Sequence, residues 1–157
     1  MGIADTFGLA FYKAQEAAGL KLPLSGSVLL TVNDRDKEEV VDIAKRLKRL
    51  GFSILATEST SAFLKGKGVE SSLIKKLHEG RPNIADAIKN KEINLIVNTP
   101  IGRTSKFDDS YIRIMAIQHK LPYITTMAAA RASVEAIEAM KGSDIALKSL
   151  QEYHNKK

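Results

Sequence analysis

From Ser27 onward, short apolar runs alternate with longer segments whose apolar residues recur at helical spacing. This alternation restricts the fold more than any other feature, because strands joined by helical crossovers pair in parallel and bury both faces of the sheet. The predicted strands lie at residues 27–31, 52–56, 69–77, 93–97 and 123–126. The sequence therefore predicts an α/β protein with a three-layer α/β/α, Rossmann-like fold and a mostly parallel sheet of about five strands.

Capping and helix-ending residues set the bounds of the helices between these strands. The first crossover helix ends at Gly51, and a last, alanine-rich helix covers residues 127–140. The tail from 144 to 157 is compatible with a strand, a helix or a frayed end. The expected caps or first residues of the crossover helices are Asn33 or Asp34, Ser59, Pro82, and Asp108 or Asp109.

The first 26 residues stand apart from the alternating pattern. Residues 5–18 have an apolar stripe at helical spacing, but no strand precedes them, and residues 19–26 have the composition of a linker. We therefore expect residues 1–26 to be a connecting helix and linker, and residues 27–157 to be the α/β domain.

Composition restricts the class of protein. A chain of 157 residues with 44% hydrophobic and 27% charged residues suits one soluble domain, and no apolar stretch reaches the roughly 18 residues of a membrane span. The absence of cysteine excludes disulfides, thiol nucleophiles and thiolate metal sites, so we expect a cytoplasmic protein. The net charge of +6 comes from scattered basic residues, which suits anionic small molecules as well as nucleic acid.

Polar side chains follow the predicted strands at the points where the strands end. In a parallel sheet these ends lie on one side, so the side chains are expected to converge on one crevice. Hydroxyl, ammonium, guanidinium and amide groups suit a phosphorylated ligand, and no carboxylate belongs to the set. The residues are Lys37, Thr57, Thr60, Lys76, Arg81 and Asn98.

Each of these groups also has a purely structural interpretation. Thr57 and Thr60 surround a strand-to-helix turn, where a phosphate could bind, but serine and threonine cap helices regardless of function. The basic loop from 75 to 82 could face an anion or only solvent. Asn98 could bind a ribose or a base edge, or only cap its strand, and Lys37 could be a solvated helical lysine.

Five motifs, taken in order, resemble one family. They are Asp-Lys-Glu-x-Val-Val-Asp (36–42), Gly-Phe (51–52), Ala-Thr-x-x-Thr (56–60), Lys-x-His-Glu-Gly-Arg-Pro (76–82) and Asn-Thr (98–99). Together they resemble the C-terminal regulatory domain of the carbamoyl-phosphate synthetase large subunit, which has the methylglyoxal-synthase-like fold. The likeness extends over the whole chain, and its opening resembles the passage that leaves the second ATP-using half of that subunit.

The resemblance implies an allosteric domain of a glutamine-hydrolysing, ATP-dependent ligase of arginine and pyrimidine biosynthesis. It implies that Lys37, Thr57, Thr60 and Lys76 hold the phosphate of a nucleotide effector such as UMP or IMP. The other implied effector contacts are Asn98 for the ribose and Ser110, Tyr111 and Ile112 near the base, and Thr125 matches the threonine implicated in ornithine binding.

The resemblance also implies the partners of such a domain. These are the nucleotide, ornithine, the rest of the large subunit and the glutamine-amidotransferase small subunit, with no nucleic acid and no membrane. ATP with magnesium or manganese would belong to the parent enzyme, and no cofactor to this domain. Pro100 stands where family members can carry a hydroxyl residue, and the loop 103–109 differs in length, so the choice of effector stays open.

Two other functions compete with the regulatory one. A methylglyoxal synthase or a related phosphate-substrate enzyme needs a carboxylate base, and that motif resembles Gly-Gly-Asp where this chain has Glu79-Gly80-Arg81. An arginine in that place stays protonated and cannot act as the base. A nucleic-acid binder ranks lowest, because no basic helix interleaved with aromatic residues is present.

Overall fold

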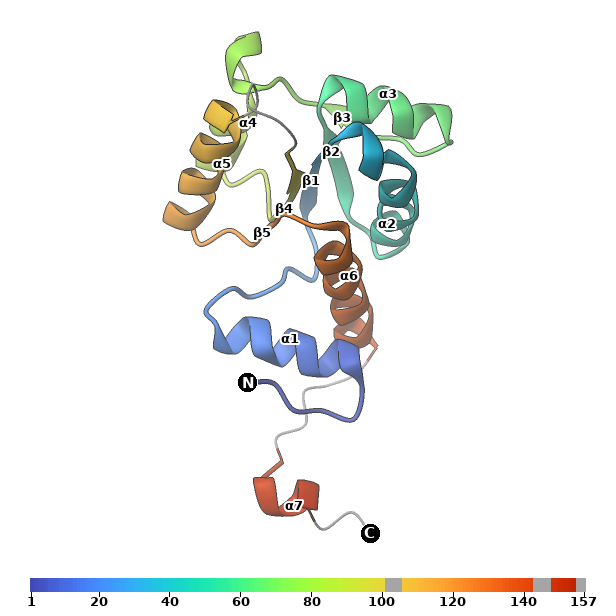
Figure 1. Cartoon of the computed structure of the whole chain (residues 1–157), viewed down its shortest axis with the longest axis vertical. Coiled ribbons are helices and arrows are strands. Elements are labelled where there is room, and N and C mark those ends of the chain that lie inside the picture. The colour runs from blue at the N-terminus through green and yellow to red at the C-terminus, as the bar shows by residue number, and fades with distance from the viewer. Residues whose placement is uncertain (101–105, 143–147, 155–157) are drawn as a thin grey trace.

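A single parallel sheet of five strands organises the part of the chain that the computed structural model describes, residues 1–100, 106–142 and 148–154. The strand order is β3-β2-β1-β4-β5, and every neighbouring pair is parallel. The predicted α/β class with a parallel sheet is therefore confirmed (Figure 1). The strands are β1 (Ser27–Val32), β2 (Ser53–Ala56), β3 (Ser72–Leu73), β4 (Leu95–Thr99) and β5 (Tyr123–Ile124).

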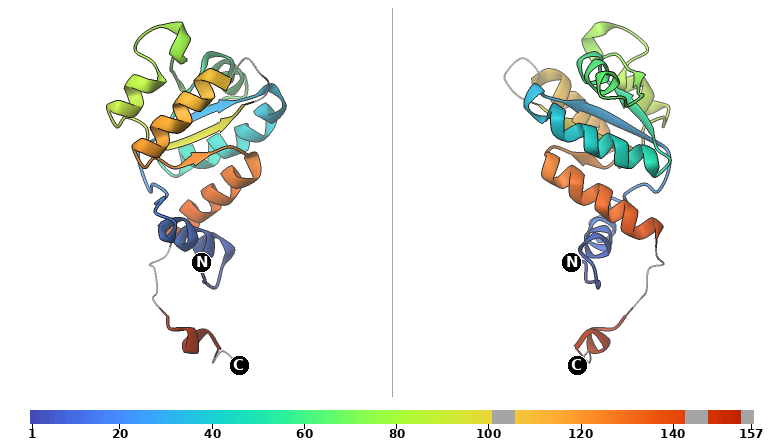
Figure 2. Two further views of the ribbon diagram at one scale, coloured as in Figure 1. Left: turned by 60° about the vertical axis from the view of Figure 1, so that its left-hand side comes forward. Right: turned by 90° about the vertical axis from the view of Figure 1, so that its right-hand side faces the viewer.

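Helices cover both faces of this sheet, as Figures 1 and 2 show from three directions. Helices α2 and α6 pack on one face, and α4 and α5 pack on the other. The helices are α1 (Phe7–Ala17), α2 (Lys37–Arg49), α3 (Glu58–Gly66), α4 (Ile84–Lys89), α5 (Lys106–Gln118), α6 (Met127–Lys141) and α7 (Leu150–His154). A single 3₁₀ turn, η1 (Asp34–Asp36), follows β1, and a second one, η2 (Leu77–Glu79), precedes α4.

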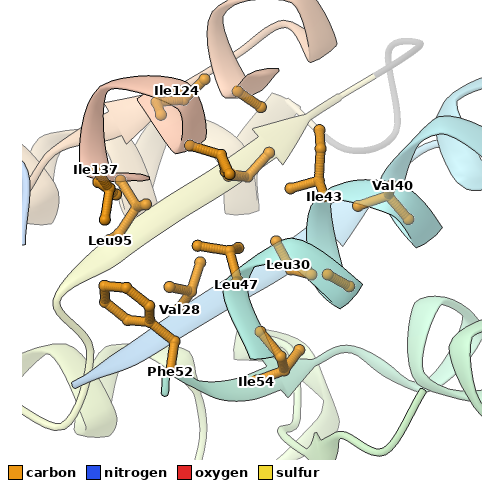
Figure 3. Close-up of a cluster of buried hydrophobic side chains, with 14 of the residues drawn as sticks. Val28, Leu30, Val40, Ile43, Leu47, Phe52, Ile54, Leu95, Ile124 and Ile137 are labelled. Carbon is orange, nitrogen blue, oxygen red and sulfur yellow. The ribbon is translucent and has the colours of Figure 1, made fainter. Parts of the chain in front are cut away.

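The central strand β1 is buried on both faces because its side chains alternate between two cores. Val28 and Leu30 belong to the cluster under α2 and α6, and Leu29 belongs to the cluster under α4 and α5. Figure 3 shows Val28 and Leu30 beside Leu47 of α2 and Leu95 of β4. An apolar run without a polar face is typical of a strand covered by helices on both sides.

The N-terminal segment packs on the domain through α1 and α6. The two helices approach closely at Gly8, where a Cβ atom would come within 2.8 Å of the Glu135 carbonyl oxygen. Tyr12 is buried, and its hydroxyl donates to the Leu22 carbonyl at 3.2 Å. Residues 1–26 therefore contribute side chains to the main core, while their assignment as a connecting segment stays a prediction.

Several predicted boundaries differ from the structure. Helix α5 begins at Lys106, so the predicted cap at Asp108 or Asp109 is wrong, and both residues lie in its first turn. Acidic residues stabilise a first turn as well as a cap, which is why the sequence does not separate the two. Helix α4 begins at Ile84 behind Asn83, whose side chain accepts from the amides of Ala85 and Asp86.

The remaining boundaries are shifted by smaller amounts. Helix α3 begins at Glu58 rather than at Ser59, and Asn33 caps the turn η1 through the amide of Arg35. The third strand is reduced to Ser72–Leu73. The C-terminal tail contains α7, and residues 144–147 and 155–157 of it lie outside the described residues. Among the described helices, none is both long and apolar enough to cross a membrane.

An ion pair joins α2 to α6 across the surface of the main core. Arg46 donates from Nε to Glu138 Oε1 at 2.9 Å and from a terminal nitrogen to Oε2 at 2.6 Å. This hydrogen bond lowers the pKa of Glu138 and raises the pKa of Arg46. Because the folded state favours the ionised carboxylate, the pair stabilises the fold at neutral pH and ceases to do so as the pH falls through the lowered pKa.

We expect Glu138→Gln to lower the melting temperature at pH 7 by about 1–4 °C, since a partly exposed pair contributes about 0.2–1 kcal/mol. The difference from the unmodified chain should shrink as the pH is lowered below the ordinary glutamate pKa of 4.5, in calorimetry or circular dichroism. Glu70→Gln is the matched control, because Glu70 is 96% exposed and 4.0 Å from Lys48. A difference for Glu138→Gln that grows at low pH would contradict this account.

Candidate effector site

A cavity of about 650 Å³ opens at the carboxyl ends of β1, β2 and β4. The strand order reverses between β1 and β4, and in open parallel sheets ligands bind at such a switch point. The β1–β4 register places Thr31 beside Asn98 and Val32 beside Thr99 at this edge. The lining residues used below are Asp34, Arg35, Thr57, Ser59, Thr60, Lys76, Ile84, Asn98, Asp109 and Ile112.

The threonine hydroxyls at the start of α3 are buried in this cavity rather than used as helix caps. Thr57 and Thr60 are only 2% and 1% exposed. Thr57 occupies the N-cap position without making a side-chain capping bond, and its hydroxyl donates to the hydroxyl oxygen of Thr31 at 3.3 Å. Thr60 Oγ1 accepts from the Val32 amide at 3.3 Å, so its own proton is left to donate to a ligand.

The backbone amides at the start of α3 are also suited to bind an anion. Ser61 is the first residue whose amide bonds back to Thr57, so the amides of Glu58, Ser59 and Thr60 come before the first intrahelical bond. These amides carry the positive end of the helix dipole. Together with the two buried hydroxyls they form the donor set that a phosphate group requires.

Lys37 reaches this helix start from α2. Its ammonium group hydrogen-bonds to Ser59 Oγ and lies 2.6 Å from Asp34 Oδ1. The hydrogen bond from Lys37 lowers the pKa of Asp34. Lys37 therefore borders the cavity through two of its lining residues, and its charge is matched by a carboxylate when no ligand is bound.

Of the two cations predicted for the site from the basic loop 75–82, only one lines the cavity. Lys76 is half-buried and lines the cavity, while its backbone amide donates to Glu79 Oε2 at 2.7 Å. Arg81 is 75% exposed, lies 3.4 Å from Asp86 and does not line the cavity. The predicted convergence of Arg81 with the other groups is therefore wrong. The turn at Gly80 and the pairing with Asp86 direct the guanidinium group away.

Asn98 is held in one orientation by two neighbours. Its amide nitrogen donates to Asp109 Oδ1 at 3.1 Å and to the Tyr123 hydroxyl at 2.7 Å. Burial of Tyr123 raises the pKa of its hydroxyl. Both amide protons of Asn98 are engaged within the protein, so its oxygen is left to accept from a ligand hydroxyl.

The other residues predicted for the site lie in two places. Ile112 is 3% exposed and lines the cavity. Ser110 and Tyr111 lie on the exposed side of α5 and are not among the lining residues. Thr125 is exposed between β5 and α6, also outside the cavity. The structure therefore groups Ile112 with the phosphate-type donors and separates Ser110, Tyr111 and Thr125 from them.

The cavity also contains charged groups that the sequence did not assign to it. Asp34, Arg35 and Asp109 line it, so the prediction that no carboxylate belongs to the site is wrong. Asp34 and Arg35 lie shortly after the end of β1 at Val32, so their position in the sequence indicates this edge of the sheet. Asp109 comes from the first turn of α5, far along the chain. Among the described residues, no group of three or more histidine, aspartate or glutamate side chains could hold a metal ion.

A second basic cavity of about 620 Å³ lies elsewhere, lined by Lys45, Lys48 and Arg49 of α2 and by residues 68–70. These positions follow or occupy the last turns of α2 and α3. The helix dipole is negative there, so basic residues in the last turn already stabilise α2 and need no bound anion. This second cavity is therefore the weaker candidate.

Comparison with known proteins identifies the family of this chain. Residues 39–125, more than half of the chain, match the MGS-like domain. The chain belongs to the MGS-like domain family. It is 48% identical over 155 residues to the C-terminal section of the carbamoyl phosphate synthase large chain of Methanopyrus kandleri, covering 98% of this chain and 29% of that protein. It is also 48% identical over 155 residues to the large chain of Archaeoglobus fulgidus, covering 98% of this chain and 14% of that one.

The chain thus spans less than a third of the length of either relative. Among solved structures, a methylglyoxal synthase from Elizabethkingia anophelis has a TM-score of 0.57 at 12% identity, with 87% of this chain and 94% of that one covered. At this identity the likeness shows the fold alone. The fold and family predictions are confirmed, while the binding roles of individual residues stay predictions.

The buried hydroxyl of Thr60 generates a prediction about stability. We expect Thr60→Val, which keeps the shape, to lower the free energy of unfolding by about 1–3 kcal/mol, because the Val32 amide loses its acceptor. Urea unfolding measures this. Ser59→Ala, at the exposed neighbouring position, is the control and should cost less. Equal stability of Thr60→Val and the unmodified chain would show that this hydrogen bond contributes nothing.

Proposed function

We propose that this MGS-like domain is the allosteric regulatory domain of a carbamoyl-phosphate synthetase large chain and binds a nucleoside monophosphate in the cavity described above. The observation that carries the proposal is the pair of buried threonine hydroxyls that line the cavity at the N-terminus of α3, where Lys37 bonds to Ser59. The curated relatives named above support the synthetase context. UMP and IMP are the effectors that the resemblance implies.

The phosphate would bind at the start of α3. Thr60 would donate its hydroxyl proton, and Thr57 would donate its own after its hydroxyl turns from Thr31 to the phosphate. The amides of residues 58–60 would donate along the helix axis. Lys37 and Lys76 would supply the charge, since ammonium groups form charge-assisted hydrogen bonds to phosphate. This arrangement explains why two hydroxyls are buried where simple capping does not need them.

The nucleoside would extend from the phosphate toward α5. The oxygen of Asn98 would accept from a ribose hydroxyl, because both protons of its amide already bond to Asp109 and Tyr123. The buried side chains of Ile84 and Ile112, which line the same cavity, would contact the base. Ser110 and Tyr111, on the outer side of α5, would reach the nucleotide only after rearrangement.

Ornithine would bind at a different place. Thr125 is exposed beyond β5 and outside the cavity, so an ornithine site there would be completed by the rest of the large chain.

We also assign the glutamine-amidotransferase small subunit, ATP and a divalent metal to the parent enzyme, which we place in the cytoplasm. A nucleotide would regulate that enzyme by binding one conformational state more tightly, a coupling typically of about 1–3 kcal/mol.

An enzymatic role is less well supported by the same site. A methylglyoxal synthase needs a carboxylate poised to remove a proton. Asp34 is paired with Lys37, and Asp109 accepts from Asn98, so the two carboxylates among the described lining residues are both engaged. Arg81 stands where the Gly-Gly-Asp motif has its aspartate, and it is a cation that lies outside the cavity.

We expect UMP or IMP to raise the melting temperature of the domain, whereas uridine or inosine should not. At about 100 times Kd the stabilisation is about 2.7 kcal/mol, or about 5–10 °C for a domain of this size. A thermal-shift titration measures this. Indifference to every nucleoside monophosphate at millimolar concentration would contradict the proposed function.

Lys76→Ala should weaken nucleotide binding about ten- to a hundredfold, because a charge-assisted hydrogen bond of about 1.5–3 kcal/mol is lost. The melting temperature without ligand should change little, since Lys76 is not part of the core. Calorimetric titration gives the affinity. Lys48→Ala is the matched control, because Lys48 lines the second basic cavity instead. Equal losses from both substitutions would mean that only general positive charge attracts the ligand.

Asp34→Asn should strengthen nucleotide binding about fivefold at low salt. The substitution removes a negative charge beside the proposed phosphate position and releases Lys37 from its ion pair. The gain should diminish in 0.5 M salt because the carboxylate is exposed and screened. Glu38→Gln is the control, since Glu38 pairs with Lys67 away from the cavity. Weaker binding by Asp34→Asn would show that Asp34 helps to hold the ligand.

A further inference from the structure

Three hydrogen bonds join the loop after β1 to the end of β4, where the strand order reverses. The side-chain nitrogen of Asn33 donates to the Thr99 carbonyl oxygen at 2.9 Å and to the Thr99 hydroxyl at 3.0 Å. The backbone amide of Asn33 donates to the same hydroxyl at 3.3 Å. We call these three bonds the Asn33–Thr99 contact. It joins residues 66 positions apart in the sequence, and Thr99 is buried.

This contact does more than cap the turn η1. The cap itself uses only the side-chain oxygen of Asn33, which accepts from the Arg35 amide at 2.9 Å. Aspartate or serine would cap the turn about equally well. The side-chain nitrogen of Asn33 donates one proton to Asp36 Oδ2 at 2.6 Å, and the two oxygens of Thr99 share the other. The nitrogen therefore fixes the turn relative to β4, which a cap alone would not do.

The contact lies where the two walls of the cavity diverge. The last paired residues of β1 and β4 are Val32 and Thr99, and Pro100 has no N–H with which to extend the ladder. Beyond this point the chain leaves β1 for α2 on one face of the sheet, and it leaves β4 for α5 on the other face. The Asn33–Thr99 contact therefore holds the two loops together at the edge of the cavity.

The two residues of this contact belong to the two halves of the proposed nucleotide site. On the β1 side, η1 leads directly into Lys37, which hydrogen-bonds to Ser59 at the start of α3, where the phosphate would bind. On the β4 side, Thr99 directly follows Asn98, whose oxygen would accept from the ribose. The contact thus sets the distance between the phosphate group of the ligand and its ribose.

We propose that Asn33 is a positioning residue that makes the cavity selective for a phosphate at the 5′ position of the ribose. This inference rests on the proposed function. Asn33 lines the cavity, but both protons of its amide are used within the protein, so it acts through Thr99 and η1. A 5′-phosphate leaves the neighbouring 2′ and 3′ hydroxyls free for Asn98, whereas a 3′-phosphate occupies one of them. Two subsites at a fixed separation therefore favour the 5′ isomer.

The 5′ and 3′ isomers of UMP and of IMP test this inference, because each pair has the same composition. The unmodified chain should bind the 5′ isomer more tightly than the 3′ isomer in calorimetric titration. Asn33→Ala should reduce that preference about three- to tenfold, the range of one net hydrogen bond, mainly by weakening the 5′ isomer. A merely structural role of Asn33 would weaken both isomers by the same factor and leave the preference unchanged.

Thr99→Val and Thr99→Ser provide a second comparison that does not require Asn33→Ala to fold. Valine removes the hydroxyl that Asn33 uses and should reduce the preference in the same direction, whereas serine keeps the hydroxyl and should preserve it. Asn90→Ala is the matched control, because the Asn90 amide bonds to Glu92 at 3.1 Å and does not line the cavity.

The inference is overturned if Asn33→Ala keeps the preference of the unmodified chain, or if Thr99→Ser loses it as fully as Thr99→Val does. Equal binding of the two isomers by the unmodified chain would also overturn it, while the proposed function would stand. Failure of the unmodified chain to bind any of these nucleotides would instead overturn the proposed function, and this inference with it.

Discussion

The pairing of β1 with both β2 and β4 is the constraint on which the rest of the structure depends. These two parallel ladders bring the carboxyl ends of three strands to one edge of the sheet. The cavity lies beyond these ends, where the strand order reverses. The ladders hold because Val28, Leu29 and Leu30 are completely buried between helices on both faces. The position of this apolar strand therefore determines the geometry of any ligand site at the carboxyl edge.

Polar groups at that edge are arranged by bonds that cross between elements. Thr60 of α3 bonds to the backbone of β1, Asn98 of β4 bonds to residues of α5 and β5, and Lys37 of α2 bonds to Ser59 of α3. Each of these three side chains is thus positioned by an element other than its own. Such bonds fix the side chains before a ligand arrives, which reduces the conformational entropy that binding must overcome.

The parts of this structure that periodicity controls could be predicted from the sequence. The apolar runs specify β1, β2 and β4, and the helical spacing specifies α2 and α6. Thr57, Thr60, Lys76 and Asn98 could be assigned to one edge because every parallel strand ends there. The third strand was less predictable, since only Ser72 and Leu73 pair with β2.

Features that depend on loop direction could not be predicted in this way. Whether Arg81 turns toward the cavity or toward Asp86 is decided by the conformation of the turn at Gly80. The presence of Asp109 at the site depends on where α5 begins, and first-turn and capping positions share the same residue preferences. Periodicity also could not predict that Tyr111, Ile114 and Ile117 are exposed, because an apolar residue on the outer face of a helix resembles a core residue in sequence.

The most direct test of the central claim is an amide NMR titration of the domain with UMP or IMP, because it reports where the phosphate binds. The account predicts saturable shifts at residues 58–60 and at Lys76, with the second basic cavity around Lys48 and Gly68 unchanged. The corresponding nucleoside should leave the amides at the start of α3 almost unmoved. Shifts concentrated around Lys48 and Gly68, or equal shifts at residues 58–60 with the phosphate-free nucleoside, would contradict it.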